Sequence, residues 1–506
     1  MEEVVNFGVL SLIPAILAVV LAFWTKNVVI SLLISLYTGA LIIASWNPWQ
    51  ALQDMFSNYL FVNITDSGNA QTVIMMSFVG GFVALIEKSG GAKAFARAIA
   101  SKVTSKSTAQ GCTWIGGLAI FFSDSGNSLI LGPIFRPIMD RLKVSRAKLA
   151  YILDSTSSPV CILIPVTGWG VYIMSIIATE YENLGIQEND VSAFMHAMPY
   201  QFYAILALLL VPLIAFGKRD FGPMAIAEEN AKHGLTAEQM AADEEVAVSE
   251  DAHVSAWNMI IPLIVLFVTI FTMFIGWGFP TQNVPGSKIR IALTSGYFLA
   301  SIVLGVMIIK QKLMSFNDVF DTFIGGIKKM AGILVIIICA WGVGGVCSNL
   351  GTSSFIVEAT IDVIPASMVP AMLFLIGAVI SFATGTSWGT MAILLPLGIN
   401  MAYSFEVSEY ITIAAVLSGS LFGDHCAPIS DTTVMSSMAA GCNHIEHVKT
   451  QIPYALLAAI AAFISYLILG VTEVSAAIAL PVAIVILVVL YFICAKLFGK
   501  KTAGAN

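Results

Sequence analysis

The sequence predicts an all-α polytopic membrane protein, with about 11 transmembrane helices and two re-entrant hairpins arranged as an inverted-topology repeat. Only 11% of the 506 residues are charged and 58% are hydrophobic, whereas a soluble domain keeps about a quarter of its residues charged. The apolar residues form runs of about 20, the length that crosses the hydrocarbon of a bilayer. Two further apolar segments lie between loops of matching charge, which places both ends of each segment on one side of the membrane.

The apolar runs define the expected spans. The chain starts with Met1-Glu2-Glu3 and lacks the positive region and cleavage site of a secretory signal, so the first run is expected to remain as a span. The expected transmembrane segments are residues 7–24, 28–45, 72–87, 148–178, 198–216, 257–276, 290–309, 331–350, 411–441, 452–470 and 476–497.

The segment 111–140 is expected to be a hairpin that enters the membrane from the cytoplasm. The loops on either side, 88–110 and 136–148, are rich in Lys and Arg, which marks both as cytoplasmic. The sequence Asp-Ser-Gly-Asn-Ser at 124–128 falls near the tip. Irregular backbone at membrane depth is tolerated only where protein buries it or where it lines a wet cavity. The tip is therefore a candidate functional site.

The segment 366–402 is expected to be a second hairpin that enters from the opposite side. Acidic residues flank it, with Glu358 and Asp362 before it and Glu406 and Glu409 after it. These loops carry none of the positive charge that is typical of cytoplasmic loops. Counting spans outward from these assignments places the N-terminus outside and the C-terminus inside.

An acidic stretch, 217–256, is expected to link two repeats through the cytoplasm. The first repeat covers residues 1–216 and the second covers 257–470, and 471–506 adds a C-terminal helix. Lysines around Lys329 mark a further cytoplasmic loop, just before the span at 331–350.

Matching motifs support the repeat. Asp-Ser-Thr-Ser-Ser-Pro at 154–159 corresponds to Asp-His-Cys-Ala-Pro at 424–428, and the first hairpin tip corresponds to Thr-Gly-Thr-Ser-Trp-Gly at 384–389. The offset between the halves is about 263 to 270 residues. Two copies of one unit with opposite orientation are typical of carriers that work by alternating access.

Intramembrane aspartates are the main candidates for the chemistry. Asp154 and Asp424 each precede a proline within an apolar span, and proline breaks a helix and frees carbonyl groups. Asp431 follows Asp424 by seven residues, so a continuous helix would turn both to one side. A carboxylate at the bilayer centre costs about 2.5–3.5 kcal/mol, and it is stabilised either by protonation or by a mobile cation. Competition between Na⁺ and H⁺ for it is an exchange mechanism, although capping of half-helices is the alternative role.

Small polar residues at the hairpin tips supply further oxygen ligands that suit Na⁺, with close helix packing as the alternative role. His425, beside Asp424, is expected to tune proton affinity. The expected ion- or substrate-binding residues are Asp124, Ser125, Asn127, Asp154, Ser157, Thr384, Thr386, Ser387, Asp424 and Asp431, and those expected to couple protons are Asp154, Asp424 and His425.

Two other patterns point to different chemistry. Residues 385–389 match G-x-S-x-G, which would make Ser387 and His425 a hydrolase pair, but that motif requires a preceding strand. Several His and Cys residues lie close in sequence near 425–447, with His444 and His447 in an expected cytoplasmic turn, but their spacing fits no standard zinc site. We therefore expect no enzyme activity, no cofactor beyond transported Na⁺ and H⁺, and no nucleic-acid partner.

The motifs resemble those of a known transporter family. Gly-Asp-His-Cys-Ala-Pro-Ile-Ser-Asp-Thr-Thr at 423–433, followed by Ser436 and by Ala-Ala-Gly at 439–441, resembles the NhaC-type Na⁺/H⁺ antiporter family. The motifs at 154–159 and 384–390 resemble the same family.

The resemblance covers about residues 70–470. It implies the ion transporter superfamily fold with paired hairpins, and a homodimer. Relatives of this kind include malate/lactate antiporters and amino-acid carriers, so the resemblance leaves the substrate open.

The expected function is Na⁺/H⁺ antiport by alternating access in the lipid of the cell membrane. The alternative is a Na⁺- or H⁺-coupled antiporter or symporter of a small organic solute. Trp169, Trp388 and Tyr172 would then line the solute pocket.

Overall fold

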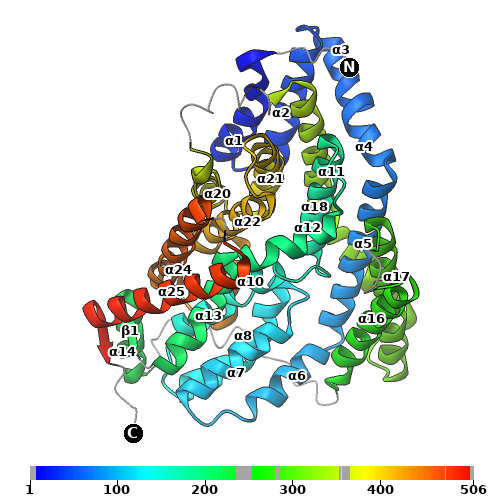
Figure 1. Ribbon diagram of the computed structural model, residues 1–506. Coiled ribbons are helices and arrows are strands. Elements are labelled where there is room, and N and C mark those ends of the chain that lie inside the picture. Colours follow the sequence, from blue (N-terminus) through cyan, green and yellow to red (C-terminus); the bar gives the residue numbers. More distant parts are fainter. Residues whose placement is uncertain are drawn as a thin grey trace.

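The chain forms a bundle of helices in the computed structural model (Figure 1), as expected for the fold class. Within the described residues, β structure is limited to the antiparallel ribbon of β1 (Arg219–Phe221) and β2 (Gly499–Lys501). Much of the acidic linker, together with Glu358 and Asp362, lies outside the described residues. The structure describes residues 7–217, 219–234, 254–279, 284–352, 355, 365–472 and 474–501.

The N-terminal part contains a bend that the hydropathy pattern did not predict. After the second helix the chain turns by 119° into a further helical stretch that ends at Thr65. Polar residues such as Gln53 and Asn58 interrupt the apolar run there, so no span was expected. The elements are η1 (Gly8–Leu12), α1 (Ile13–Thr25), α2 (Val28–Ile43), α3 (Pro48–Asp54), the π-helix η2 (Met55–Phe61), α4 (Val62–Thr65) and α5 (Ser67–Lys88).

The segment expected as the first hairpin consists of two helices that pack on each other. It begins earlier than the predicted residue 111, because Ser105 and Thr108 form a capping box that starts the helix. Ser123 caps the second helix and places Asp124 in its first turn. The elements are α6 (Gly91–Ala100), α7 (Lys106–Ala119) and α8 (Asp124–Arg141).

The expected span 148–178 is interrupted. The helix ends at Ser155, and Pro159 lies at the start of the next short helix, as the proline argument predicted. The elements from here to the linker are α9 (Arg146–Ser155), α10 (Ser158–Cys161), α11 (Gly168–Leu184), α12 (Asp190–Ala197), η3 (Met198–Tyr200) and α13 (Phe202–Gly217). The first part of the expected linker also forms two short helices, α14 (Gly222–Asn230) and η4 (Ala231–His233).

Three long apolar helices follow the linker: α16 (Trp257–Gly276), α17 (Gly286–Lys310) and α18 (Phe316–Asn349). The last is 34 residues long, so the span predicted at 331–350 is only part of it. Lys329 therefore lies within a helix and not in the expected loop.

The second hairpin and the following helix show the same pattern as the first half. A helix of 16 residues and one of 18 residues form the hairpin. The expected span 411–441 breaks around Pro428. The elements are η5 (Ala366–Met368), α20 (Val369–Thr384), α21 (Ser387–Ser404), α22 (Glu409–Cys426), α23 (Asp431–Ala440), α24 (His444–Thr472) and α25 (Ala476–Leu497).

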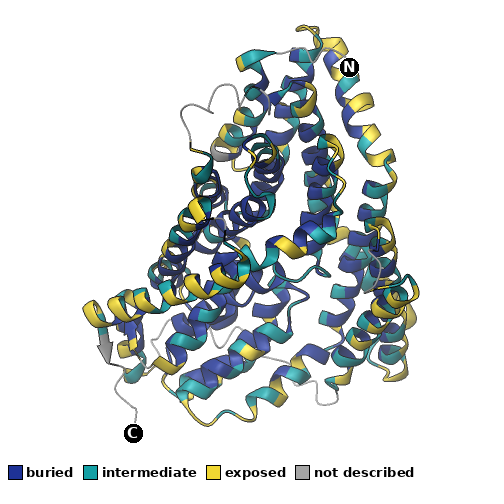
Figure 2. Ribbon diagram, viewed as in Figure 1, coloured by how far each residue is buried: buried dark blue, intermediate teal, exposed yellow. Residues whose placement is uncertain are grey.

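Apolar side chains cover much of the outer surface. Exposed residues follow the outward sides of peripheral helices such as α16 and α25 (Figure 2), where Ile275 is 67% and Val485 is 61% exposed. Among the described residues, seven helices are long and apolar enough to cross a membrane, or up to nine if each bent pair is one span. Of the other expected spans, 7–24 is a shorter apolar helix, and 148–178 and 411–441 are broken helices. Such a surface fits lipid as the surrounding solvent.

The two hairpins approach the centre of the molecule from different sides. In Figure 1, α7 and α8 occupy the lower part, while α20 and α21 lie in the upper part. Residues at both tips line one cavity, and this places the candidate site between the halves of the chain.

Candidate functional site

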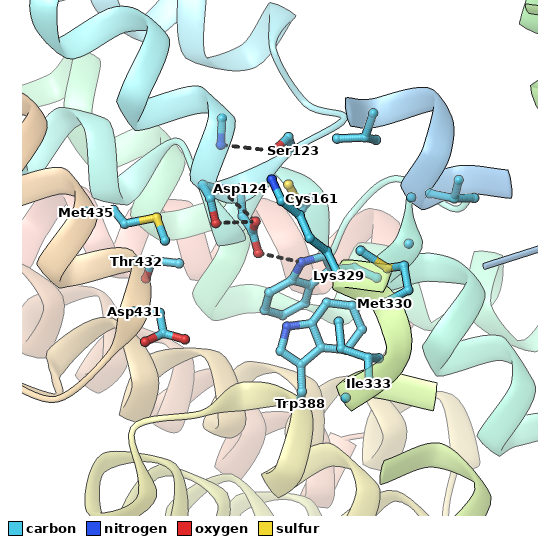
Figure 3. A pocket seen from close by; sticks show the side chains of 18 of the residues that line it. Ser123, Asp124, Cys161, Lys329, Met330, Ile333, Trp388, Asp431, Thr432 and Met435 are labelled. Carbon is cyan, nitrogen blue, oxygen red and sulfur yellow. Dashed lines mark hydrogen bonds between the residues drawn. The ribbon is translucent and has the colours of Figure 1, made fainter. Parts of the chain in front are cut away.

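A cavity of about 630 Å³ lies where the hairpin tips meet α5, α11, α18 and the break between α22 and α23. Figure 3 shows the Asp124 and Lys329 side chains in this cavity, with Asp431 at a separate position on its wall. Its charged lining residues are Glu87, Asp124, Lys329, Asp424 and Asp431.

The structure brings half of the predicted binding residues to this cavity. Asp124, Ser125, Thr386, Asp424 and Asp431 line it. The other predicted residues lie behind this wall, where their contacts are with neighbouring protein groups.

The first hairpin tip holds Asp124 through three hydrogen bonds. Its Oδ1 accepts from the backbone N of Ser125 at 2.6 Å and from the Ser125 hydroxyl at 3.1 Å. Its Oδ2 accepts from the indole Nε1 of Trp169 at 3.1 Å. Beside it, the Ser123 hydroxyl donates to Glu87 Oε1 at 2.6 Å. The carboxylate is therefore fixed in orientation and half-buried at the cavity wall.

Asn127 and Ser157 join the first hairpin to the broken helix. The Asn127 amide donates to the backbone oxygens of Gly117 and Thr156, each at 2.8 Å. The Ser157 hydroxyl donates to the Asp124 carbonyl at 2.6 Å. These contacts make both residues structural connections between the tip and the helix break.

The second tip turns at Gly385, which adopts a φ of +68°. A β-carbon at this position would lie 2.9 Å from the Ile429 carbonyl oxygen, so glycine allows both the turn and the approach to the α22–α23 break. Thr384 donates to the Ile380 carbonyl of its own helix at 2.9 Å. Thr386 lies at the cavity wall.

Asp424 is a buried carboxylate whose two oxygens differ in their contacts. Its side chain is only 6% exposed, and it lies in the last turn of α22. Oδ2 accepts a hydrogen bond of 2.7 Å from the Ser387 hydroxyl, while Oδ1 has no partner among the described residues. Asp431 begins α23 and is exposed. The two aspartates share the cavity because the chain breaks between them, and not because a continuous helix aligns them.

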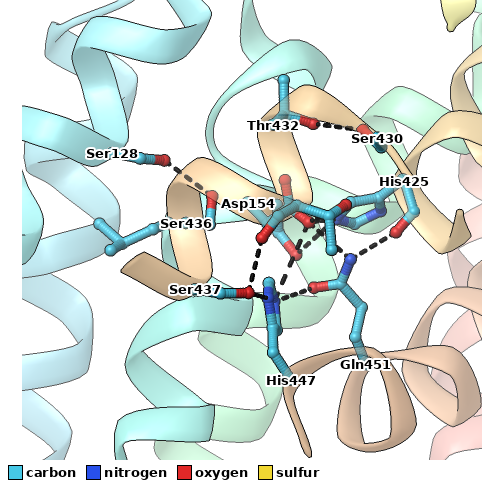
Figure 4. Close-up of polar contacts among 12 residues, drawn as sticks. Ser128, Asp154, His425, Ser430, Thr432, Ser436, Ser437, His447 and Gln451 are labelled. Carbon is cyan, nitrogen blue, oxygen red and sulfur yellow. Dashed lines mark hydrogen bonds and ion pairs between the residues drawn. The ribbon is translucent and has the colours of Figure 1, made fainter. Parts of the chain in front are cut away.

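Asp154 is buried outside the cavity lining, in a polar network shown in Figure 4. Its Oδ2 accepts from Thr433 Oγ1 at 3.0 Å and from Gln451 Nε2 at 2.7 Å. The Nε2 atoms of His425 and His447 lie 4.0 and 3.9 Å from the same oxygen. The network joins α9 of the first half to α22, α23 and α24 of the second.

His447 occupies a different position from that expected, whereas His425 lies beside Asp424. His447 was expected in a cytoplasmic turn, but it is fully buried and its Nε2 lies 2.8 Å from Gln451 Oε1. His425 Nδ1 lies 2.7 Å from the Tyr203 hydroxyl. Ser387, the serine of the hydrolase-like motif, begins a helix after another helix and donates to Asp424.

Aromatic rings form one side of the cavity. Trp169 and Trp388 both line it, and their ring centroids are 4.6 Å apart. Tyr172 packs against Trp388 at 4.8 Å, and its hydroxyl donates to the Trp388 carbonyl at 2.8 Å. Tyr172 therefore supports the cavity wall from behind.

Three polar residues of the site were missed by the sequence analysis. Glu87 precedes Lys88 at the end of an apolar run and looks like a residue of the membrane boundary. Gln451 lies at the start of a predicted span, and a neutral amide at that place does not indicate a binding site. Lys329 was assigned to a loop. An intramembrane acid at the end of a span, as at Glu87, was the one available signal.

The profile of the Na⁺/H⁺ antiporter family matches residues 160–471. An uncharacterized protein of Haemophilus influenzae is 33% identical over 93% of this chain and 93% of its own length. The malate-2H⁺/Na⁺-lactate antiporter of Bacillus subtilis is 26% identical, over 36% of this chain and 38% of its own.

The fold also occurs among solved structures. The YdaH transporter of Alcanivorax borkumensis aligns with a TM-score of 0.61 at 14% sequence identity. The alignment covers 84% of this chain and 90% of the transporter.

Proposed function

This chain belongs to the Na⁺/H⁺ antiporter family, and from this we propose that it exchanges Na⁺ for H⁺ across the cell membrane. As a family member it is a multi-pass secondary antiporter. In this proposal, Asp424 is the carboxylate for which Na⁺ and H⁺ compete. It includes the predicted orientation, with the N-terminus outside, and a homodimeric assembly.

The observation that carries the proposal is the buried Asp424 carboxylate at the cavity wall. One of its oxygens has a hydrogen-bond donor and the other has none among the described residues. A buried carboxylate is strongly stabilised by a proton or by a cation, because low dielectric penalises an isolated charge. A single site that accepts either cation, but not both at once, couples their movement in opposite directions.

Asp154, which is buried outside the cavity lining, is proposed as a second exchange carboxylate. Its Oδ1 also has no partner among the described residues. Its other oxygen contacts groups of the second half through Thr433 and Gln451. A relative movement of the two halves would change these contacts and open Asp154, which is what alternating access requires.

The size and aromatic wall of the cavity favour a second candidate function. A dehydrated Na⁺ fills only a small part of about 630 Å³. Trp169, Trp388 and Lys329 line the same space, and aromatic faces and a cation are suited to an organic acid or amino acid. In this alternative the aspartates bind only the coupling ion.

The test uses purified protein in proteoliposomes with a lumenal pH dye. An imposed Na⁺ gradient should drive proton flux without any organic solute, and Asp424→Asn should abolish this flux while the protein stays folded. Asp321→Asn, on the exposed surface of α18, is the matched control and should exchange normally. Flux that appears only when an organic acid or amine is added supports the second candidate. Normal exchange by Asp424→Asn excludes Asp424 as the exchange site.

A further inference from the structure

Buried oxygens without partners gather where α20, α21 and α22 meet. Besides Asp424 Oδ1, the hydroxyls of Ser381 on α20 and Ser420 on α22 have no hydrogen-bond partner among the described residues. Both serine side chains are completely buried. Desolvated oxygens without a donor or an ion are costly, so three of them in one region indicate a missing positive partner.

Serines inside helices normally satisfy their hydroxyls by donating to the carbonyl four residues earlier. Other buried serines in this chain do so: Ser437 donates to Thr433 at 2.7 Å and Ser465 donates to Ala461 at 2.8 Å. Ser381 and Ser420 make no such bond. Their hydroxyls are thus left available for a different interaction.

A glycine brings the helices that carry the three oxygens into direct contact. A β-carbon added to Gly423 would lie 2.7 Å from the Ser381 β-carbon, so α20 and α22 are in direct contact beside Asp424. Ser420 lies one helical turn before Asp424, on the same side of α22. The Ser387 hydroxyl lies 3.2 Å from the Ser420 carbonyl and 2.7 Å from Asp424 Oδ2. Side chains from three helices therefore meet at one short segment of α22, the segment that carries Ser420 and Asp424.

We propose that Ser381, Ser387, Ser420 and Asp424 form a Na⁺ site behind the second hairpin tip, a site that deepens the proposed function and rests on it. The set contains hard oxygen donors without nitrogen or sulfur, which suits a hard cation. It carries one negative charge, which balances a monovalent ion.

The Ser387 hydroxyl has two acceptors and allows the site to exchange ions. Without Na⁺ it donates to Asp424. When the ion binds, the hydroxyl rotates toward the Ser420 carbonyl, and its lone pairs turn to the ion. Protonation of Asp424 forms an O–H bond on the carboxylate and removes its negative charge, and Na⁺ is released, so one proton taken up replaces one ion that leaves.

The test is direct Na⁺ binding by the purified full chain, read as thermal stabilisation against Na⁺ concentration with choline as the counter-cation. A ligand that binds only the folded state stabilises it by RT ln(1 + c/Kd), where c is the free ligand concentration, so the stabilisation at each Na⁺ concentration reports the affinity. Ser381→Ala and Ser420→Ala should each raise the Na⁺ concentration needed for a given rise in melting temperature by about 10-fold or more, since a contact to an ion contributes about one to two powers of ten. Ser465→Ala, which removes an equally buried hydroxyl on α24, should leave it unchanged.

A cysteine variant distinguishes the loss of an oxygen ligand from the loss of folding. Ser381→Cys keeps the size of the side chain and replaces a hard oxygen with a soft sulfur, so it should fold as the wild type and still bind Na⁺ weakly. Unchanged Na⁺ binding in the Ser381 and Ser420 variants overturns the site, as does a wild type that shows no Na⁺-specific stabilisation. Na⁺ binding that depends on these serines, without Na⁺-driven proton flux in liposomes, supports the site and refutes Na⁺/H⁺ exchange.

Discussion

A substitution of Asp154 can remove the charge proposed for exchange while it keeps the hydrogen bonds that stabilise the fold. In Asp154→Asn the amide oxygen can take the place of Oδ2 and keep the hydrogen bonds from Thr433 and Gln451. The amide nitrogen then replaces Oδ1, which has no partner among the described residues. The expected cost is one buried donor without an acceptor, about 1–3 kcal/mol, while the charge that exchanges cations is gone.

Asp154→Ala removes both acceptors at once. It leaves the Thr433 hydroxyl and one Gln451 donor without their acceptor, which costs roughly 2–6 kcal/mol in total. The two histidines also lose the carboxylate that lies 3.9–4.0 Å away. The alanine variant should therefore melt well below the asparagine variant, although both should lack exchange.

The assay combines thermal unfolding in detergent with proton flux in proteoliposomes, and Asp321→Ala serves as the surface control. Exchange at the wild-type rate by Asp154→Asn would refute the role of Asp154. Equal melting temperatures for the alanine and asparagine variants would refute the hydrogen-bond argument. Only the alanine variant leaves the Thr433 and Gln451 donors without their acceptor.

Two further predictions concern the second hairpin and the loop between α11 and α12. Gly385→Ala should lower the transport rate and cost about 1–2 kcal/mol for the left-handed backbone alone, with more from the clash at Ile429. Gly185→Ala is the control for backbone strain in both melting and transport assays. Gly185 also has a left-handed backbone, at a φ of +70°, but a β-carbon added there would have no atom within 4 Å. Burial raises the pKa of Glu188, but hydrogen bonds, including one of 2.7 Å from Tyr410, outweigh it and hold the pKa below its usual value. Tyr410→Phe should therefore lower the melting temperature at pH 7, where the carboxylate is charged in both states, and the difference should shrink as the pH falls below about 4. A difference that is constant across pH would show that Tyr410 acts by packing alone.

Hydropathy and proline placement predicted the parts of the fold that depend on local sequence. The breaks after Asp154 and Asp424 and the turn at Gly385 occur where proline and glycine required them. The span at 331–350 was placed too short, because the polar residues at the start of α18 concealed its first turns.

The arrangement of the site depended on tertiary contacts that no local pattern encodes. Asp154 was expected beside Asp424 in one binding set, yet it lies in a separate network with His447 and Gln451. Glu87 reaches the first hairpin tip from another helix through Ser123. Neither partnership has a fixed spacing in the sequence, so spacing could not reveal it.

The helix breaks divide the four aspartates into two electrostatic classes. Asp124 and Asp431 lie in the first turns of α8 and α23, where the positive end of the helix dipole favours a charged carboxylate. Asp154 and Asp424 lie in the last turns of α9 and α22, where the negative end of the dipole disfavours it. In the proposed mechanism, the first pair would attract cations into the cavity. The second pair lies where a bound cation would offset the dipole, which fits the exchange role that we propose for it.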